Sequence, residues 1–406
     1  MSYRFQKFTT VYPEFTRQFL DENVDYRSLS YSELYERFVG SHYGWANYYA
    51  KNLSTLGVQA EDLFVDIEPL QKAWAKEHGV KYSQNNWQRE IILAQVRSFR
   101  PDVLYLQDLY YFNADFRKEL RETCGKRVLI LGWQAAPTED YAVLRDLDLV
   151  LTCAPHFAKY MRQAGANGVL FLHAFESSIL SALPSVPNRN FDFTFIGSFV
   201  LQDGFHQERF GMVQTLLRST PLEVWGDVSI TTAPSRRTRL RSKAAVIARK
   251  LPAFEKLKNV RNGFASQRQL NNRSSIDNRG DLFQGRFRKS VYGLRYYEIL
   301  ASSKVTFNIH VDCAEHYAGN MRLFEATGVG ACLVTDRKDN LADMFEPDVE
   351  VVSYSSAEEC AEKVRYLLEH DSEREAIAAA GQNRVLRDHT FERRAKCLDE
   401  LISQAL

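Results

Sequence analysis

The chain has 406 residues, of which 45% are apolar and 25% are charged, and its formal net charge is +1. This length is too great for one ordinary core and predicts two domains of ordinary globular composition. No run approaches the roughly 18 apolar residues that span a bilayer, and the opening residues lack the apolar run of a signal peptide, so we expect a cytoplasmic protein. The six cysteines are scattered without metal-ligand spacing, which predicts reduced thiols.

The first half of the sequence alternates short apolar runs with helical patterns, such as the one from Asn86 to Phe99. Alternation of this kind predicts a parallel sheet covered by helices on both faces, here an N-terminal lobe over residues 1–180. The expected strands cover Phe5–Val11, 103–107, 128–133, 149–152 and 169–172.

A stretch bearing Pro and Asn at 181–190 predicts a linker, and the alternation then resumes in a second lobe over 190–390. We therefore expect an α/β protein with two Rossmann-like, doubly wound lobes that face a cleft, with ligands at the carboxyl ends of the strands. The expected strands of the second lobe cover 193–197, 222–225, 305–309, 331–335 and 349–352. The expected helices cover 206–218, 292–302, 357–369, 374–386 and 391–401.

Charge is distributed unevenly along the chain. The segment 228–290 holds sixteen Lys or Arg residues and three acidic ones, a net charge of +13, which leaves about −12 for the rest. Within it, apolar residues recur at helical spacing among basic residues over 236–261. We expect a basic, partly amphipathic helical insert in the second lobe, and two interpretations stay open. It either packs on that lobe or lies on an anionic membrane surface.

The most informative stretch is NMRLFEATGVGACLVTD, residues 320–336. It predicts a loop, a short helix, a tight turn with Gly328 and Gly330, and a buried strand. Arg322 in the first helical turn suits a diphosphate, and Glu325 one turn later suits the two hydroxyls of a ribose. The alternative is that Glu325 forms a local cap or ion pair and that the glycines only make a turn.

This stretch resembles the sugar-nucleotide signature of GT-B glycosyltransferases, in which a Glu in an R-x-F-E-A-x-x-x-G frame holds the donor ribose. The sequence is most similar to the CgeB-like (spore maturation protein) glycosyltransferases, through PDVLYLQDLY, FDFTFIGSF, LEVWGD and YYEILASSKVTFNIHVD as well as the C-terminal tail. The resemblance implies a GT-B fold in which the helix at 391–406 packs back on the first lobe. It also implies a sugar transferase that uses a nucleoside-diphosphate sugar, with UDP as the first expectation. The acceptor would be a glycan, a lipid-linked molecule or another hydroxyl compound.

One position departs from the retaining members of that fold class. They carry an acid eight residues before the ribose Glu, where this chain has Tyr317, and Glu315 is offset by two. The choice between retention and inversion at the anomeric carbon therefore stays open.

Further candidates for the donor side follow from their places at strand and helix ends. Gly197 and Ser198 follow a strand, Arg209 begins a helix, and His310 ends the strand before the glycine-rich stretch. The full predicted set of donor-binding residues is Gly197, Ser198, Arg209, His310, Asn320, Met321, Arg322, Glu325 and Gly330. Each also has an ordinary structural interpretation as a turn, surface or loop residue.

An inverting reaction needs a base for the acceptor hydroxyl in the first lobe. Asp108, directly after the strand at 103–107, is the first candidate, and His42, before a helix, is the second. A turn or capping role for Asp108 is the alternative.

We expect neither a metal nor another cofactor. The one Asp-x-Asp pattern, Asp146-Leu147-Asp148, precedes a strand, which is the wrong edge of the sheet for a metal-bound diphosphate. Other function classes remain: a sugar-nucleotide epimerase on the same fold, or a non-catalytic binder of a nucleotide sugar or a nucleic acid. The basic segment has few aromatics and no RNA-module signature, so no nucleic-acid partner is expected. If that segment meets a membrane, the protein is peripheral at the inner face.

Overall fold

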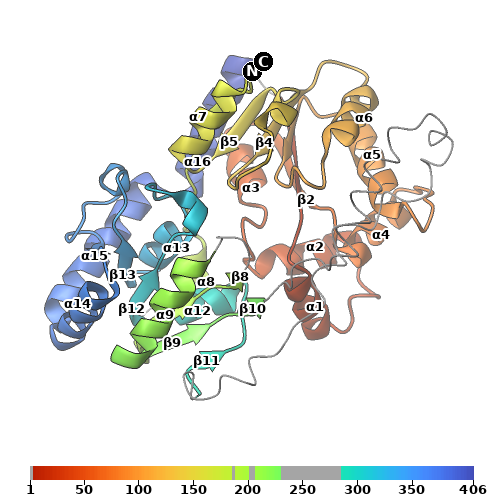
Figure 1. Cartoon of the computed structure of the whole chain (residues 1–406). Coiled ribbons are helices and arrows are strands. Elements are labelled where there is room, and N and C mark those ends of the chain that lie inside the picture. The colour runs from red at the N-terminus through yellow and green to blue at the C-terminus, as the bar shows by residue number, and fades with distance from the viewer. Residues whose placement is uncertain (1–2, 185–187, 201–205, 230–284) are drawn as a thin grey trace, which may run out of the picture.

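The computed structural model describes residues 3–184, 188–200, 206–229 and 285–406, which form two lobes (Figure 1). The expected helical insert at 228–290 falls outside the described residues except at its two ends, and its amphipathic part at 236–261 falls outside them entirely. Among the described helices, none combines the length and apolarity that crossing a membrane requires.

The N lobe is built on a six-stranded sheet in the order β2-β1-β3-β4-β5-β6, and every pairing in it is parallel. Its strands are β1 (Arg4–Thr9), β2 (Gln59–Phe64), β3 (Val103–Leu106), β4 (Leu129–Trp133), β5 (Leu149–Thr152) and β6 (Gly168–Leu170). Its helices are α1 (Pro13–Glu22), α2 (Tyr31–Gly40), α3 (Tyr48–Ser54), α4 (Glu68–Glu77), α5 (Trp87–Phe99), α6 (Ala114–Cys124) and α7 (Pro155–Gln163). The short helix α8 (Ile179–Ala182) follows on the way to the second lobe.

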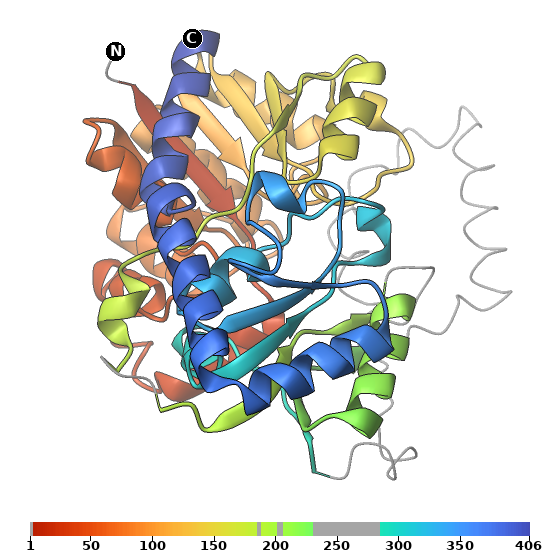
Figure 2. The same ribbon diagram turned by 90° about the vertical axis from the view of Figure 1, so that its left-hand side faces the viewer.

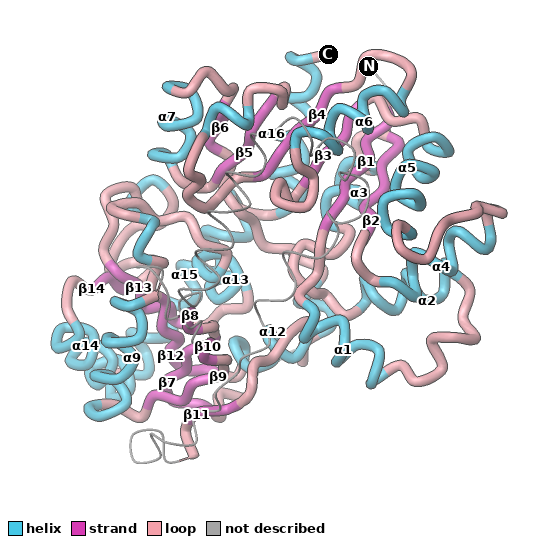
Figure 3. Tube along the Cα trace, turned by 45° about the vertical axis from the view of Figure 1, so that its right-hand side comes forward, coloured by secondary structure: helices cyan, strands magenta, loops and turns pink. Residues whose placement is uncertain are grey.

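The C lobe repeats this plan with a parallel sheet in the order β11-β9-β7-β12-β13-β14. Its strands are β7 (Phe191–Ile196), β9 (Leu222–Trp225), β11 (Phe287–Arg288), β12 (Ser303–Asn308), β13 (Cys332–Asp336) and β14 (Val352–Tyr354), while β8 (Phe199–Val200) pairs with β10 (Val228–Ser229). Its helices are α9 (Gln207–Ser219), α12 (Leu294–Ala301), α13 (Arg322–Gly328), α14 (Ala357–Glu369), α15 (Asp371–Asp388) and α16 (Phe391–Ala405). Figure 3 shows the two sheets, each flanked by helices. The predicted architecture of two doubly wound α/β lobes is confirmed.

Several strands differ from the sequence-based expectation, among them the two-residue strands β8, β10 and β11, which it does not contain. The strand β2 is absent from it, because only the last residues of this strand form an apolar run. The run at 349–352 is a turn for most of its length, and β14 begins only at Val352. Asp348 has a φ of +61° there, and the Glu350 amide donates to the carbonyl of Glu346 at 2.8 Å, so the backbone reverses before the strand starts.

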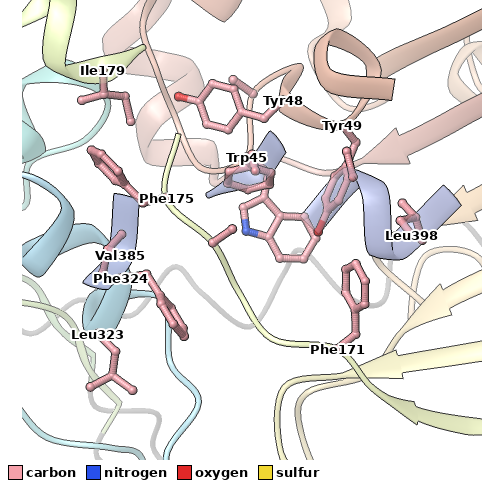
Figure 4. Close-up of a cluster of buried hydrophobic side chains, with 14 of the residues drawn as sticks. Trp45, Tyr48, Tyr49, Phe171, Phe175, Ile179, Leu323, Phe324, Val385 and Leu398 are labelled. Carbon is pink, nitrogen blue, oxygen red and sulfur yellow. The ribbon is translucent and has the colours of Figure 1, made fainter. Parts of the chain in front are cut away.

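The chain crosses between the lobes twice, and the two crossings are hydrogen-bonded to each other. The amide of Phe175, on the first crossing, donates to the carbonyl of His389, and the amide of Phe391, on the second, donates to the carbonyl of Phe175, both at 2.9 Å. A Cβ at Gly328 would overlap the ring of Phe175, so glycine lets α13 pack directly on this crossing. Figure 4 shows the apolar cluster that fills the region, with side chains from both lobes.

After the second crossing α16 runs along the N lobe (Figure 2). Its first residue, Phe391, packs on Tyr48 and Tyr49 of α3, with ring centroids 5.0 and 5.2 Å apart. Further along, Asp399 accepts a hydrogen bond from the Tyr3 hydroxyl at 2.8 Å. The C-terminal helix therefore completes the core of the N-terminal lobe.

Candidate active site

The carboxyl edge of the C-lobe sheet faces the N lobe. A Cβ at Gly319, in the loop between β12 and α13, would overlap the carbonyl oxygen of Cys153, which directly follows β5. His156 at the start of α7 contacts the carbonyl of Cys313 in the same loop through Nε2 at 3.2 Å. Side chains at this edge therefore lie where the two lobes meet, the place at which ligands bind in doubly wound sheets.

Arg322 lies at this edge and spans the ends of two neighbouring strands. Its guanidinium donates to the carbonyl of Ile196 at the end of β7 and, at 3.3 Å, to Oδ1 of Asn308 at the end of β12. It also lies 5.1 Å from the centroid of the Phe195 ring. Its Nε is buried and has no partner among the described residues. The side chain is thus fixed in place with one donor unused.

A second cation, Arg209 of α9, approaches the same edge. Its guanidinium donates to the carbonyls of Ser198 at 3.2 Å and Ile309 at 3.0 Å, and only 7% of the residue is exposed. Burial and the nearby charge of Arg322 lower the pKa of Arg209 to about 10. Among the described residues, no carboxylate forms a close ion pair with either arginine, although the charges of Asp336 and Asp312 act on Arg209 and that of Glu325 lies near Arg322.

Glu325 lies on α13 one turn after Arg322, and only 7% of it is exposed. Its two carboxylate oxygens accept hydrogen bonds from the hydroxyls of Tyr296 at 2.7 Å and Tyr297 at 3.2 Å, both on α12. Burial raises the pKa of Glu325, while the two hydroxyls and Arg322 act in the opposite direction. Arg322 thus lies near both Arg209 and Glu325, and two tyrosines to which the sequence assigned no role bind the carboxylate.

The other predicted donor-side residues fall into two groups. At the edge itself, Gly197 leaves room for Arg322, because a Cβ there would lie 3.1 Å from Nη2 of that side chain. Asn320 is paired with Asn308 through a 2.7 Å hydrogen bond, and Met321 precedes α13 and packs on the core. Ser198 is exposed and contributes its carbonyl to Arg209.

His310 and Gly330 have structural roles within the C lobe. Nδ1 of His310 lies 2.6 Å from Oδ1 of Asp336, and its Nε2 accepts from the amide of Gly319 at 3.2 Å, so both ring nitrogens are used. Burial raises the pKa of Asp336, but His310 together with Lys338 holds this pKa below its usual value. Gly330 precedes β13, at the opposite edge of the sheet. Gly330 has a turn role there, at a φ of +77°, and its contact with a donor stays a prediction.

The two candidate bases of the N lobe, Asp108 after a strand and His42 before a helix, are both hydrogen-bonded. Asp108 follows β3 and accepts from the amides of Tyr110 and Tyr111 at 3.0 and 3.1 Å and from the hydroxyl of Thr10 at 3.0 Å. This is the turn role considered as the alternative, although the carboxylate keeps spare acceptor positions.

His42 lies before α3, with a φ of +56°, and its Nδ1 is 3.1 Å from the Tyr48 hydroxyl. Burial lowers the pKa of His42.

A residue absent from the sequence analysis, Asp66 after β2, lies near Asp108. Burial, with the charge of Asp108 as a smaller contribution, raises the pKa of Asp66 to about 7.

The Asp-x-Asp pattern is used for internal ion pairs. Asp146 pairs with Arg117 at 2.6 Å, and Asp148 pairs with Arg121 at 2.7 Å and accepts from the Ile130 amide at 2.8 Å. In the described ranges, no group of three His, Cys, Asp or Glu side chains is placed to hold a metal ion.

Comparison with known proteins identifies the fold class as GT-B, the two-lobed Rossmann-like fold of many glycosyltransferases. The chain superposes on a UDP-glucose complex of Anabaena Alr3699/HepE with a TM-score of 0.55 at 9% identity, covering 99% of this chain and 100% of that one. A glycosyltransferase from Rickettsia africae ESF-5 gives a TM-score of 0.53 at 10% identity, over 100% and 98% of the two chains. The α,α-trehalose 6-phosphate synthase from Burkholderia multivorans gives 0.50 at 11% identity, over 100% and 99%.

The sequence itself gives a narrower match. Residues 254–400 match the family model described as glycosyl transferase-like. The model includes α13 with Arg322 and Glu325. None of the curated proteins matches the chain in sequence. The narrower resemblance to CgeB-like proteins therefore stays a prediction.

Proposed function

We propose that this protein is a glycosyltransferase that moves a sugar from a nucleoside-diphosphate sugar, UDP-linked as the first choice, to a hydroxyl group of an acceptor. The observation that carries the proposal is the group at the carboxyl edge of the C-lobe sheet. There, the charge of the Arg322 guanidinium acts both on the buried carboxylate of Glu325 and on the second cation, Arg209.

This group matches the chemistry of a nucleoside diphosphate. A guanidinium presents a planar fork of donors that suits phosphate oxygens, and each of the two arginines has a buried Nε without a partner among the described residues. Preorganised cations at this edge of the sheet stabilise the negative charge that develops on the leaving diphosphate. The backbone at Gly226 also packs closely on the backbone at Gly197, since a Cβ at Gly226 would overlap the carbonyl oxygen of Gly197.

The comparisons support the same class of substrate. The Anabaena protein was solved with UDP-glucose and with UDP and glucose, and it shares the fold of this chain. The glycosyl transferase-like model covers the part of the chain that holds Arg322 and Glu325. UDP-glucose is therefore the first donor to test.

Acceptor activation is assigned to the N lobe. If the reaction inverts the anomeric carbon, Asp108 is the proposed base, with His42 as the second candidate, and the acceptor is a glycan or lipid-linked hydroxyl. We propose that no metal takes part, because both carboxylates of the Asp-x-Asp pattern, Asp146 and Asp148, are committed to arginines.

Release of UDP from UDP-glucose in water tests the proposal. The intact protein is expected to release UDP slowly, and Arg322→Ala is expected to lose both this release and UDP binding. Arg295→Ala is the matched control, because Arg295 on α12 is exposed and forms its ion pair, among the residues that the structure describes, with Glu298 at 2.7 Å. Failure to bind any of UDP-, GDP-, dTDP- or CMP-sugars in a thermal-shift screen would reject the proposal.

The basic segment 236–261, outside the described residues, belongs to a second part of the proposal. We propose that it brings the active site to an anionic membrane surface, where about 1 kcal/mol per well-placed Lys or Arg is available. Sedimentation with anionic liposomes at low salt is the measurement. Equal binding after neutralisation of these basic residues would contradict this part alone.

A further inference from the structure

Two neighbouring tyrosines of α12 hold the carboxylate of Glu325 from one side. Tyr296 donates to Oε2 at 2.7 Å and Tyr297 donates to Oε1 at 3.2 Å, so each oxygen receives one hydrogen bond. An ionised carboxylate has about two acceptor positions on each oxygen. Counting the partners that the described part of the chain supplies, one position remains on each oxygen, a match for two neighbouring hydroxyl groups.

The two tyrosines and Arg322 favour the ionised state of Glu325, in which both oxygens accept hydrogen bonds, against the effect of burial. Tyr297 is 3% exposed, and the pKa of each tyrosine is raised well above its usual value, by burial and by the charge of Glu325, so both stay protonated donors. Burial alone raises the pKa of Glu325, and the Tyr296 hydroxyl is the largest influence in the opposite direction, followed by Arg322 and Tyr297. From the N lobe, Tyr48 of α3 also faces this charge.

A lone buried carboxylate without these donors would have neither a fixed orientation nor a stable charge. Rotation of the carboxylate would carry its free acceptor positions away from a bound ribose, and a proton would turn one acceptor into a donor. The hydrogen bonds from the two tyrosines oppose both changes. They are also supplied by a different helix from Glu325, so the site depends on the packing of α12 against α13.

We propose that Tyr296 and Tyr297 are positioning residues that orient Glu325 to accept both hydroxyls of a ribose. The site consequently selects ribonucleoside diphosphates over 2′-deoxyribonucleoside diphosphates. This inference rests on the proposed function, because it assumes that a nucleoside diphosphate binds here. A 2′-deoxy ligand would leave one acceptor position of a buried carboxylate unfilled, which is the kind of mismatch that binding sites discriminate strongly.

Calorimetric titration of the full chain with UDP and with 2′-deoxyuridine 5′-diphosphate tests the inference. The wild-type protein is expected to bind UDP at least about tenfold more tightly than the deoxy compound. Tyr296→Phe is expected to weaken UDP binding about three- to thirtyfold and binding of the deoxy compound less, because the deoxy compound makes one contact fewer with Glu325, so the ratio falls toward one. Tyr297→Phe acts in the same direction with a smaller effect, because its hydrogen bond is longer.

The matched control is Tyr366→Phe. Tyr366 on α14 also donates to a glutamate, Glu373, at 2.8 Å, but it does so on the exposed surface. Neither affinity should change in that variant.

A pH series separates positioning from simple packing. In Tyr296→Phe the pKa of Glu325 rises further, so the loss of UDP affinity on acidification begins at a higher pH than in wild type. An unchanged ratio and pH profile in both tyrosine variants would overturn the inference while the proposed function stands. Equal wild-type affinity for the two nucleotides would do the same. Absence of any nucleotide binding by the wild type would instead overturn both.

Discussion

Replacement of Glu325 by Gln changes the charge at the centre of the site while almost keeping its shape. Glutamine retains one carbonyl oxygen as an acceptor, but its amide nitrogen can only donate. One of the two hydroxyl hydrogen bonds expected from a ribose is therefore lost, and the other changes from a charged to a neutral acceptor. Hydrogen bonds to charged groups contribute about 1.5–3 kcal/mol and neutral ones about 0.5–1.5 kcal/mol. Since Tyr296 and Tyr297 can accept from the new amide, we expect a net loss of about 2–3 kcal/mol.

That loss corresponds to a dissociation constant for UDP that is roughly 30- to 150-fold higher. Isothermal titration calorimetry measures it directly, and the melting temperature of the ligand-free variant shows whether the fold is intact. Glu373→Gln is the matched control, because Glu373 also accepts from a tyrosine, but at an exposed position on α15. An unchanged affinity for UDP in a folded Glu325→Gln protein would refute the assignment of Glu325 to the ribose.

Three further outcomes are expected. Gly328→Ala should lower the free energy of unfolding by about 1–3 kcal/mol, because its Cβ would overlap the ring of Phe175. Gly211→Ala, in the exposed part of α9, is the control and should not lower it. Thermal unfolding measures both variants, and equal melting temperatures would contradict the packing argument. Transfer activity should survive EDTA, and loss restored by Mg²⁺ or Mn²⁺ would disprove the metal-free reaction. Burial, aided by the charge of Asp108, raises the pKa of Asp66 from 3.8 to about 7 in the folded protein, so ionisation of Asp66 costs stability as pH rises from about 4 to about 7. Asp66→Asn should therefore become more favourable relative to wild type from pH 5 to pH 8, and urea unfolding that gives the same difference at both pH values would contradict this sign.

Much of the fold was predictable because buried parallel strands are short apolar runs. Strands such as β3 and β5 appear in the sequence almost with their observed bounds. The strand β2 was not predictable in this way, since it contains Glu61 and Asp62. Asp62 is nevertheless fully buried, where it faces Lys7 of β1 at 3.4 Å. A charge pair buried between two strands depends on tertiary contacts, so a local sequence pattern does not predict it.

The candidate site was predictable where it lies on one continuous segment. Arg322 and Glu325 share a single helical turn, so their common location follows from the sequence. The approach of Arg209 and the hydroxyls of Tyr296 and Tyr297 comes from other helices, and only the packing of the sheet edge brings them together. Gly330 shows the opposite problem, since a residue close in sequence to a site can lie at the far edge of the sheet.

The position of α16 has a consequence for how the protein is made. Phe391 is 2% exposed because it packs on Tyr48 and Tyr49, which belong to the first lobe to leave the ribosome. Domains generally fold in the order of their synthesis, N-terminal first. Here the apolar surface around α3 stays uncovered until α16 has been translated. A nascent chain halted after the C lobe would thus carry a nearly complete second domain and an unfinished first one, and it is the first that would need protection by chaperones.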